Sequence, residues 1–389
     1  MLTEGQELLR SVARDFACKQ LEPRAAQIDE TEEFSTENFH GLAELGFCGL
    51  TVPESLGGAG GGYADVAIVI EELAAECGST SLVYLSHLSL GVTAIVKFGT
   101  EEQANRHVPP LAQGKQIAAF ALTEPGTGSD ALALETTAID DGNHWILNGT
   151  KSFISNGDIA NIFIVFARDR RPSGYRGISA FIVERETHGF LVNPMLGKMG
   201  LRGSPTSELI FDSCRIPKSN LLGPLGGGYQ VALRLLTSSR VSVAAQCVGL
   251  ARGAYDAALT YAQQRTAFGT VIAEKQAVAF MLADMATEID AARLMTQRAA
   301  NLVDAGEHPV RETAMAKLYA SEAAVRVASN AVQIHGGAGY FKPSKVERIY
   351  RDVRATPIYE GSSEIQRLII SRSIIGTKRI NTNNQAIKT

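Results

Sequence analysis

A glutamate near the C-terminus has neighbours that suit a catalytic base. Glu360 stands between Tyr359 and Gly361, and Ser362 and Ser363 follow. The glycine lets the backbone approach a ligand closely, and serines are typical of a helix N-terminus, whose free N–H groups attract anions. An aromatic neighbour would shield the carboxylate from water and raise its proton affinity. The pattern predicts a carboxylate aimed into a cleft, although a glutamate that only caps a helix would have the same neighbours.

Four further segments carry small, polar or basic residues that suit the binding of a cofactor. In chain order they are Leu122–Asp130 (LTEPGTGSD), Phe153–Gly157 (FISNG), Gln264–Gly269 (QRTAFG) and Gln333–Gly337 (QIHGG). The first follows an expected strand at Ala118–Ala121, and its small residues leave backbone N–H groups free to face a ligand. Each segment taken alone is also compatible with an ordinary connection between elements.

These motifs, in this order, resemble the acyl-CoA dehydrogenase family, in its FAD-dependent branch for short, medium and branched chains. The resemblance runs from about residue 3 to about residue 376. It implies an enzyme that takes a proton from the carbon alpha to a thioester and a hydride from the beta carbon. Because the hydride goes to FAD, the protein must supply a base, donors that polarise the thioester oxygen, and a dry flavin site.

The resemblance places the base at Glu360, whose backbone N–H would also point at the thioester oxygen. Some branches of the family carry the base at the position of Ser239, and a serine cannot do that work. The resemblance also implies substrate contacts, and we expect the arginine among them to open a helix. The implied substrate contacts are Ser129, Arg240, Tyr359 and Gly361.

The FAD contacts that the resemblance implies within one chain lie in the middle of the sequence and around Glu360. Backbone atoms near Leu122 and Thr123 would meet the flavin ring, and Ser129 would lie near both the flavin and the CoA. Phe153 would stack on the ring and Ser155 would bond near N5, where many members have Trp and Thr. The remaining two positions of this kind are Ser362 and Glu364.

Other implied FAD contacts come from a neighbouring subunit. Arg265 and Phe268 resemble pyrophosphate contacts, since arginine can offer a phosphate two donors at once. Gln333, Gly336 and Gly337 resemble contacts on the adenine side, although a double glycine is also favoured at a helix C-terminus. The resemblance therefore implies a tetramer built as two dimers. His335 has no second ligand at a useful spacing, so we expect an ordinary packed histidine and no metal site.

The spacing of apolar residues indicates which elements position these groups. It predicts a multidomain α+β protein with a helical N-terminal domain (1–116), a middle β-barrel or sandwich domain (117–228), a C-terminal four-helix bundle (229–380) and a flexible tail (381–389). Asn148-Gly149 between two apolar runs predicts a β-hairpin. We expect the acyl chain to lie along the helix near Leu85–Ser89 and beside the stretch before Tyr359.

Composition narrows the classes of partner and the compartment. The 389 residues carry a net charge of −4, without the concentrated basic face that a nucleic-acid partner needs. Five scattered cysteines without a Cys-x-x-Cys pair argue against disulfides and zinc, and favour a reducing compartment. We expect no membrane span and no targeting segment. The location would be cytoplasmic, or the mitochondrial matrix for a processed eukaryotic form.

The function that follows is oxidation of a saturated acyl-CoA to the trans-2-enoyl-CoA, with electrons passed to an electron-transfer flavoprotein. The same scaffold also serves oxidases that use oxygen and desaturases that act on carrier-protein thioesters. A flavin-bearing binding protein without turnover, including one that binds DNA, is an alternative from another class. Residues Leu82–Leu90 hold no arginine, which disfavours a dicarboxylate such as glutaryl-CoA, while short, medium and branched chains remain open.

Overall fold

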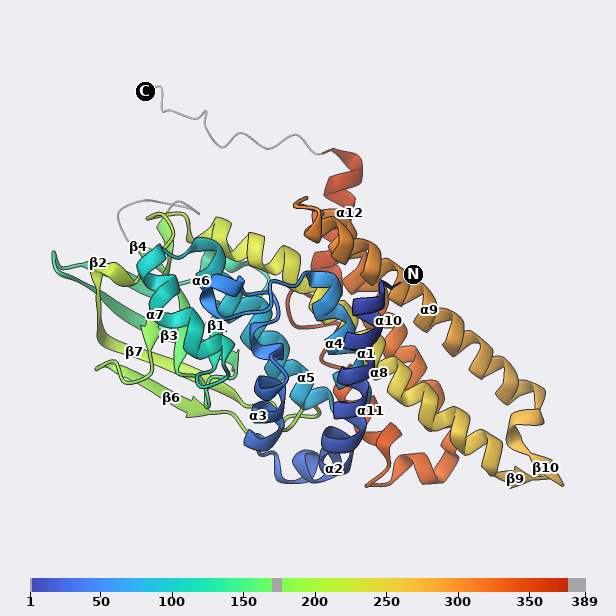
Figure 1. The fold of residues 1–389 in the computed structure, drawn as a ribbon. Coiled ribbons are helices and arrows are strands. Elements are labelled where there is room, and N and C mark those ends of the chain that lie inside the picture. The colour runs from blue at the N-terminus through green and yellow to red at the C-terminus, as the bar shows by residue number, and fades with distance from the viewer. Residues whose placement is uncertain (1, 170–176, 377–389) are drawn as a thin grey trace, which may run out of the picture.

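The computed structural model describes residues 2–169 and 177–376. A helical N-terminal part, a middle part of β-strands and a C-terminal part of long helices follow one another along the chain (Figure 1). This confirms the expected multidomain α+β fold. The predicted tail at 381–389 lies outside the described residues.

The N-terminal part consists of helices, some of which begin with capping residues. The side chains of Thr3 and Thr100 accept hydrogen bonds from the first turns of α1 and α7, as helix-capping residues do. The glycine-rich segment Gly57–Gly62 is a loop that leads into α4. The bounds are α1 Glu4–Phe16, η1 Ala17–Leu21, α2 Glu22–Thr31, α3 Thr36–Glu44, η2 Phe47–Gly49, η3 Glu54–Leu56, α4 Tyr63–Glu76, α5 Gly78–Leu85, η4 Ser86–Val92, α6 Thr93–Phe98 and α7 Glu101–Ala112.

The elements α5, η4 and α6 form one continuous apolar helix, Gly78–Phe98. By length and composition alone, its 21 residues could cross a membrane. A helix of this kind was not expected from the sequence. In the fold, however, 83% of its most apolar window is buried inside the protein. Packing in the core of the molecule accounts for the apolar composition of this helix.

The middle part is one mixed sheet of eight strands that folds back on itself. Its order is β6-β7-β3-β2-β4-β5-β8, and β1 pairs in parallel with β4. Phe163 of β4 meets Phe190 of β6 with ring centroids 4.8 Å apart, although these strands are far apart in that order. The bounds are β1 Ala118–Ala121, η5 Ala131–Ala133, β2 Thr137–Asp140, β3 His144–Ser155, β4 Ile162–Asp169, β5 Ile178–Glu184, β6 Phe190–Pro194, β7 Thr206–Pro217, η7 Lys218–Asn220 and β8 Leu221–Leu222.

The predicted hairpin at Asn148-Gly149 is wrong. The chain runs straight through it as strand β3, and the register with β7 shifts between Leu147 and Gly149. Asn148 uses its side-chain oxygen to accept a hydrogen bond from the N–H of Ser213 (2.8 Å), and Gly149 has a φ of 142°. A glycine with positive φ inside a strand forms a β-bulge as readily as a turn, so the same two residues bend the strand instead of reversing it.

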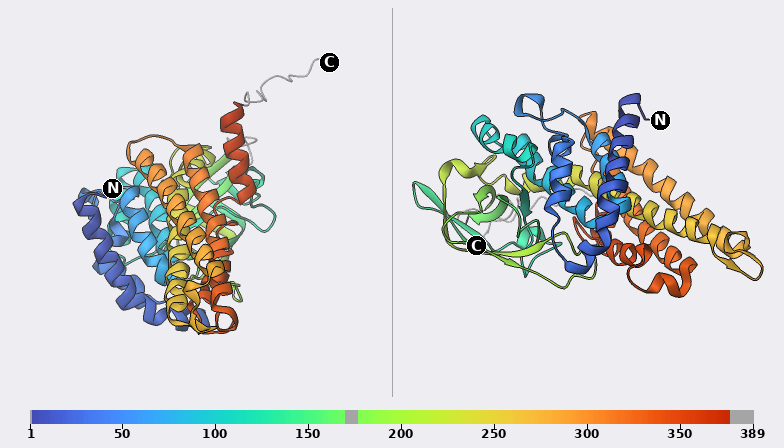
Figure 2. Two further views of the ribbon diagram at one scale, coloured as in Figure 1. Left: turned by 90° about the vertical axis from the view of Figure 1, so that its right-hand side faces the viewer. Right: turned by 60° about the horizontal axis from the view of Figure 1, so that its bottom comes forward.

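The C-terminal part is a bundle of long helices that lie side by side, with the N-terminal helices packed against it (Figure 2). Helix α8 is its axis and contacts α4, α9 and α10. A short hairpin of β9 and β10 stands at the far tip, away from the sheet (Figure 1). The bounds are α8 Gly228–Gln264, β9 Thr266–Ala267, β10 Thr270–Val271, η8 Ile272–Glu274, α9 Gln276–Asp304, α10 Val310–His335, η9 Gly336–Tyr340, α11 Lys345–Val353 and α12 Ser363–Ile375.

One buried histidine joins the N-terminal helices to the first strand of the sheet. His87 in η4 is fully buried, and its Nδ1 accepts a hydrogen bond from the N–H of Ala118 at 3.1 Å. That leaves the protonated Nε2 to donate to the carbonyl of Leu111 at 3.2 Å. Burial lowers the pKa of His87 to about 4, so the ring is neutral at physiological pH.

We predict that His87 makes folding weaker in mild acid. Its pKa is depressed in the folded state, so the unfolded chain binds more protons between about pH 6.5 and pH 4, and stability falls as pH falls through that window. The contribution is about 2 kcal/mol between pH 7 and pH 5. Urea unfolding of wild type, His87→Gln and the exposed-histidine control His188→Gln at both pH values measures it. Equal acid sensitivity in all three proteins would contradict the assignment.

Candidate active site

Glu360 lies in the loop between α11 and α12, and its carboxylate turns toward the middle of α8. Its Oε2 accepts a hydrogen bond from the hydroxyl of Ser239. Burial raises the pKa of Glu360, while the Ser239 hydroxyl and the cations Lys317 and Arg240 act in the opposite direction. A carboxylate with a raised pKa that is held beside donors is a better base than a free glutamate.

Arg240 does not open a helix as expected but lies well inside α8, which begins at Gly228. Only 4% of the residue is exposed, and its Nε has no hydrogen-bond partner in the described part of the chain. Burial lowers the pKa of Arg240 to about 10, and the nearby Glu360 carboxylate partly offsets that effect. The guanidinium is therefore a buried cation near Glu360 with an unpaired donor, which a bound ligand could use.

The residues on either side of Glu360 are held by side chains from other helices. Tyr359 donates its hydroxyl proton to Oε1 of Gln246, on α8. Gln246 in turn donates to the hydroxyl of Ser81 at 2.9 Å and to the carbonyl of Gly78 at 3.2 Å. Gly361 follows with a φ of 92°. The sequence offered no sign of Gln246, which lies more than a hundred positions before Tyr359.

The serines after Glu360 mark the start of α12, as predicted. Ser362 occupies the N-cap position, although its side chain makes no capping hydrogen bond to the helix backbone. Glu364 lies in the first turn and is exposed. Since the carboxylate of Glu360 bonds to Ser239 on another helix, Glu360 is not the capping residue of α12.

A second group of predicted residues meets in the middle part. Lys151 is fully buried and donates to Glu124 at 2.7 Å and to the carbonyl of Leu122 at 3.0 Å. The N–H of Ser152 donates to the carbonyl of Thr123 at 2.9 Å. These contacts tie the loop after β1 to the end of β3. Sequence reading missed Lys151, because only the folded chain brings it next to Glu124.

The buried Lys151–Glu124 pair is charged. Burial lowers the pKa of Lys151 to about 8, and Glu124 works against that effect. Burial alone would raise the pKa of Glu124, but Lys151 and the backbone donors outweigh it and the pKa is lowered. The N–H of Thr136 supplies one of those donors at 2.9 Å. A lysine and a glutamate that are both ionised thus fix the backbone on which Leu122 and Thr123 lie.

The exposed aromatic of this second group fits a flat ligand such as a flavin. Phe153 lies in an irregularity of β3, between Lys151 and Ile154, where the register with β7 shifts. Its φ is 59°, and 64% of the residue is exposed. Ser155 is half-buried two positions on. Bulges re-aim side chains, and this one leaves a phenyl ring uncovered beside a hydroxyl and the half-exposed Leu122 and Thr123. Ser129 lies apart from them in an exposed stretch.

A third group lies at the far tip of the bundle, opposite the sheet in Figure 1 and in the right-hand view of Figure 2. Phe268 is 97% exposed at the turn between β9 and β10. His335 stacks on Tyr261 with ring centroids 4.4 Å apart, which joins the ends of α8 and α10 and confirms a packed histidine. The remaining predicted residues of this tip are all exposed: Arg265, Gln333, Gly336 and Gly337. One chain therefore does not bring this group to Glu360.

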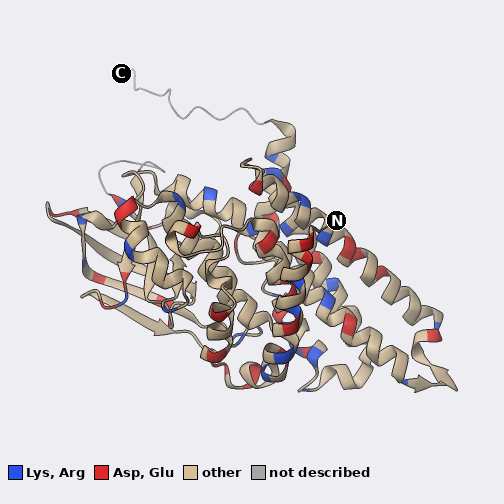
Figure 3. Ribbon diagram, viewed as in Figure 1, with Lys and Arg blue, Asp and Glu red and all other residues tan. Residues whose placement is uncertain are grey.

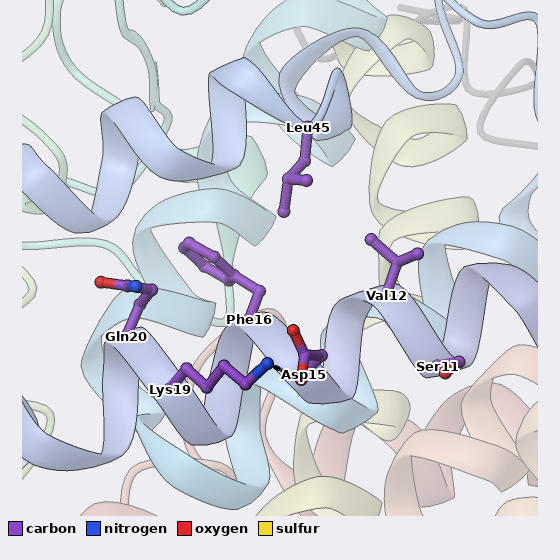
Figure 4. Close-up of a pocket in the computed structure, with 7 residues that line it drawn as sticks. All are labelled: Ser11, Val12, Asp15, Phe16, Lys19, Gln20 and Leu45. Carbon is purple, nitrogen blue, oxygen red and sulfur yellow. Dashed lines mark ion pairs between the residues drawn. The ribbon is translucent and has the colours of Figure 1, made fainter.

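A surface groove of about 370 Å³ on the N-terminal part shares no residue with these groups (Figure 4). Val12 and Phe16 of α1 face Leu45 across it, and Lys19 pairs with Asp15 at its edge.

The predicted acyl-chain helix is buried throughout Leu85–Ser89. Within it Ser89 bonds to Ser242 of α8 at 2.8 Å, whereas His87 faces Leu111 and β1. No cluster of metal-ligating side chains is found among the described residues.

Three family descriptions match successive parts of the chain. They are the N-terminal domain of acyl-CoA dehydrogenase over residues 3–115, the middle domain over residues 119–214, and the C-terminal domain over residues 226–375. All of the residue groups described above lie within these matches.

Individual proteins are similar over almost their whole length. An acryloyl-CoA reductase (NADH) of Anaerotignum propionicum is 45% identical, covering 96% of this chain and 95% of that protein. A mitochondrial short-chain specific acyl-CoA dehydrogenase of Bos taurus is also 45% identical, covering 97% and 92%. A chain in a solved structure described as the electron transferring flavoprotein of Acidaminococcus fermentans superposes with a TM-score of 0.95 at 41% identity, covering 97% and 99%. This chain belongs to the acyl-CoA dehydrogenase family, whose members are FAD-dependent oxidoreductases.

Proposed function

We propose that this protein is a short-chain acyl-CoA dehydrogenase that converts a saturated acyl-CoA to the trans-2-enoyl-CoA. The observation that carries the proposal is the half-buried Glu360 carboxylate, bonded to Ser239 and facing two buried cations. A binding protein without turnover would have no use for a carboxylate whose desolvation raises its pKa. Acidic and basic residues are interspersed along the helices, which also disfavours a DNA-binding face (Figure 3).

In this mechanism Glu360 removes the proton from the alpha carbon. Ser239 orients the carboxylate through its hydroxyl, and the proton ends on a Glu360 oxygen. The backbone N–H of Glu360 donates to the thioester oxygen, which stabilises the charge that develops as the proton leaves. Arg240 keeps a free N–H donor in the same buried space. Bound FAD supplies the acceptor for the hydride of the beta carbon.

The residues that would hold FAD are those of the second and third groups. Phe153 would pack against the flavin ring, Ser155 would donate to it, and the backbone of Leu122 and Thr123 would border it. Arg265 and Phe268 would come from another subunit, because they lie at the tip of the bundle and are exposed. That arrangement supports an oligomer, which we propose to be a tetramer of two dimers.

A short acyl chain is favoured by the relatives and by the packing behind Glu360. The bovine relative is short-chain specific, and the acryloyl group of the bacterial relative has three carbons. In this chain Tyr359, Gln246 and Ser81 form a buried chain of hydrogen bonds between the catalytic loop, α8 and α5. A long acyl chain directed there would have to separate these polar groups and leave them unpaired, at a cost of about 1–3 kcal/mol each.

The electron acceptor is the second part of the proposal. The similar chain found with the electron transferring flavoprotein of Acidaminococcus fermentans supports a flavoprotein of that kind as the partner. The relative that acts as a reductase with NADH raises the reverse direction as a second candidate, since one base and one flavin can serve both directions. Oxygen as acceptor and a carrier-protein thioester as substrate are the other outcomes that an assay can distinguish.

We predict that butyryl-CoA is the best substrate in a panel of straight and branched acyl-CoAs from C4 to C16. Because the polar chain behind Tyr359 limits the space, kcat/KM is expected to fall by about tenfold or more by C8. The measurement uses an electron-transfer flavoprotein as acceptor, with oxygen and NADH/enoyl-CoA assays in parallel. A maximum at C12 or longer would contradict the short-chain assignment, and turnover only with a carrier-protein thioester would overturn the substrate class.

We predict that Glu360→Gln keeps the fold and acyl-CoA binding but loses ~10²–10⁴-fold in the rate of flavin reduction. The amide has nearly the same size and cannot accept the alpha proton. Anaerobic bleaching of the flavin band after mixing with butyryl-CoA gives the rate. Glu288→Gln is the matched control, because Glu288 pairs with Arg326 on another face of the bundle. Bleaching of Glu360→Gln at the control rate would mean that the base lies elsewhere.

We predict that the purified protein is a yellow tetramer whose FAD is released by denaturation. Phe268→Ala should lower the FAD content at equal protein concentration, because the exposed ring at the bundle tip is expected to touch the partner subunit's cofactor. Leu191→Ala removes an apolar side chain that is 59% exposed on β6 and should retain FAD. Sedimentation and flavin absorbance measure both properties. A monomer with stoichiometric FAD and full activity would refute the shared site.

A further inference from the structure

The backbone carbonyls of Glu360 and Gly361 accept hydrogen bonds from two side chains, which come from two helices. Lys317 of α10 donates from Nζ to the carbonyl of Gly361 at 2.9 Å. Gln366 of α12 donates from Nε2 to the same carbonyl at 2.8 Å and to the carbonyl of Glu360 at 3.3 Å. Both of these side chains are fully buried. The loop that carries the base is therefore fixed from α10 and from α12 at once.

A buried lysine makes such a hydrogen bond only at a cost in desolvation free energy. Removing an ammonium group from water costs several kcal/mol unless other charges compensate for it. Gln366 shows that a neutral amide can bond to the same carbonyl. Lys317 has no ion-pair partner within the described residues, in contrast to the equally buried Lys151, which pairs with Glu124. The charge of Lys317 must therefore be balanced over a longer distance.

The groups that act electrostatically on Lys317 come from three elements. Cys247 and Arg240 lie on α8, Glu360 lies in the loop, and Glu322 lies on α10 itself. Glu360 in turn feels Lys317 from α10 and Arg240 from α8, and it influences the hydroxyls of Tyr63 on α4 and of Tyr359. Among these groups, the carboxylate of Glu360 is the partly buried anion that both Lys317 and Arg240 stabilise.

We propose that Lys317 is a positioning residue that holds the Glu360 loop and, through its positive charge, sets the pH at which Glu360 becomes available as a base. The proposal rests on the proposed function of Glu360. Arg240 has the same sign but lies on the ligand side with a free donor, whereas Lys317 is committed to the loop backbone. Lys317 therefore acts on the base in every state of the enzyme, with or without substrate.

The direction of the effect follows from the charges. The ammonium of Lys317 favours the ionised form of Glu360, so removing it raises the pKa of that carboxyl group. Burial lowers the pKa of Lys317 itself to about 8, so the group is mostly charged at pH 7. Its charge is thus present at neutral and acidic pH.

The test is the pH dependence of flavin reduction by butyryl-CoA in Lys317→Met, which has a similar shape but no charge and no donor. The midpoint of the acid limb should move up by about one pH unit or more relative to wild type. The matched control is Lys198→Met. Lys198 is a half-buried lysine whose pKa is likewise lowered to about 8 by desolvation, and it donates to the backbone carbonyl of Leu201 at 2.8 Å, away from Glu360. Its acid limb should stay where it is in wild type.

A second measurement needs no turnover. The infrared difference between each protein and the same protein with Glu360→Gln isolates the protonated carboxyl band of Glu360, which can be titrated without substrate. The midpoint should rise in Lys317→Met and stay unchanged in Lys198→Met. If the protein proves inactive on every acyl-CoA, the proposed function fails, yet this titration still decides whether Lys317 controls Glu360.

Lys317→Gln separates charge from hydrogen bonding and replaces Lys317→Met if the latter does not fold. It retains a donor on a side chain of similar length, and it should show the raised midpoint with a smaller loss of thermal stability. Unchanged midpoints in both variants, with only lower stability, would overturn the proposal. Failure of both variants to fold would also overturn it, because Lys317 would then belong to the fold rather than to the base.

Discussion

Glu360 is shielded from water and is also stabilised as an anion, and these two opposing effects come from groups on several helices. Burial favours the neutral acid, while Ser239, Lys317 and Arg240 favour the carboxylate. These residues come from α8 and α10, and the loop that carries Glu360 ends at α12. Because groups on several helices set the pKa of this carboxyl group, the helices must keep their mutual positions. A shift of an ångström would change each of these electrostatic interactions.

A partly buried ionic cluster links four of the helices. Glu71 and Glu72 of α4 lie side by side, and Glu72 is only 2% exposed. Arg14 of α1 and Arg252 of α8 bond to Glu72 at 3.0 Å and 2.6 Å, and Arg293 of α9 bonds to Glu71 at 2.9 Å. Two carboxylates so close together are tolerated because three guanidiniums share them. Arg252 contacts both carboxylates, so it is the arginine whose loss would disturb the cluster most and weaken the link between α4 and α8.

Sequence reading succeeded where a pattern is local and failed where two distant segments meet. Apolar periodicity predicted a helical N-terminal part, a middle part of strands and a C-terminal helical bundle, and the motif order placed the chain in its family. Asn148-Gly149 has the residues of a hairpin turn and forms a bulge, whereas Phe268-Gly269, a poor hairpin signal, is the two-residue turn between β9 and β10. No local pattern could indicate that Lys317 or Gln246 would reach the loop of Glu360, because both look like ordinary residues of amphipathic helices.

Three of the predicted site residues share a backbone conformation that their side chains disfavour. Phe153, Phe268 and Glu360 have φ values of 59°, 52° and 51°, a left-handed region that costs a residue with a side chain about 1–2 kcal/mol. For Glu360, hydrogen bonds from Lys317 and Gln366 to the carbonyl of Gly361 offset the cost of this conformation. Phe153 and Phe268 are mostly exposed, and no part of the described chain covers their rings. The strain at these two positions therefore directs bare aromatic surface outward, toward the cofactor and the neighbouring subunit that the proposed function requires.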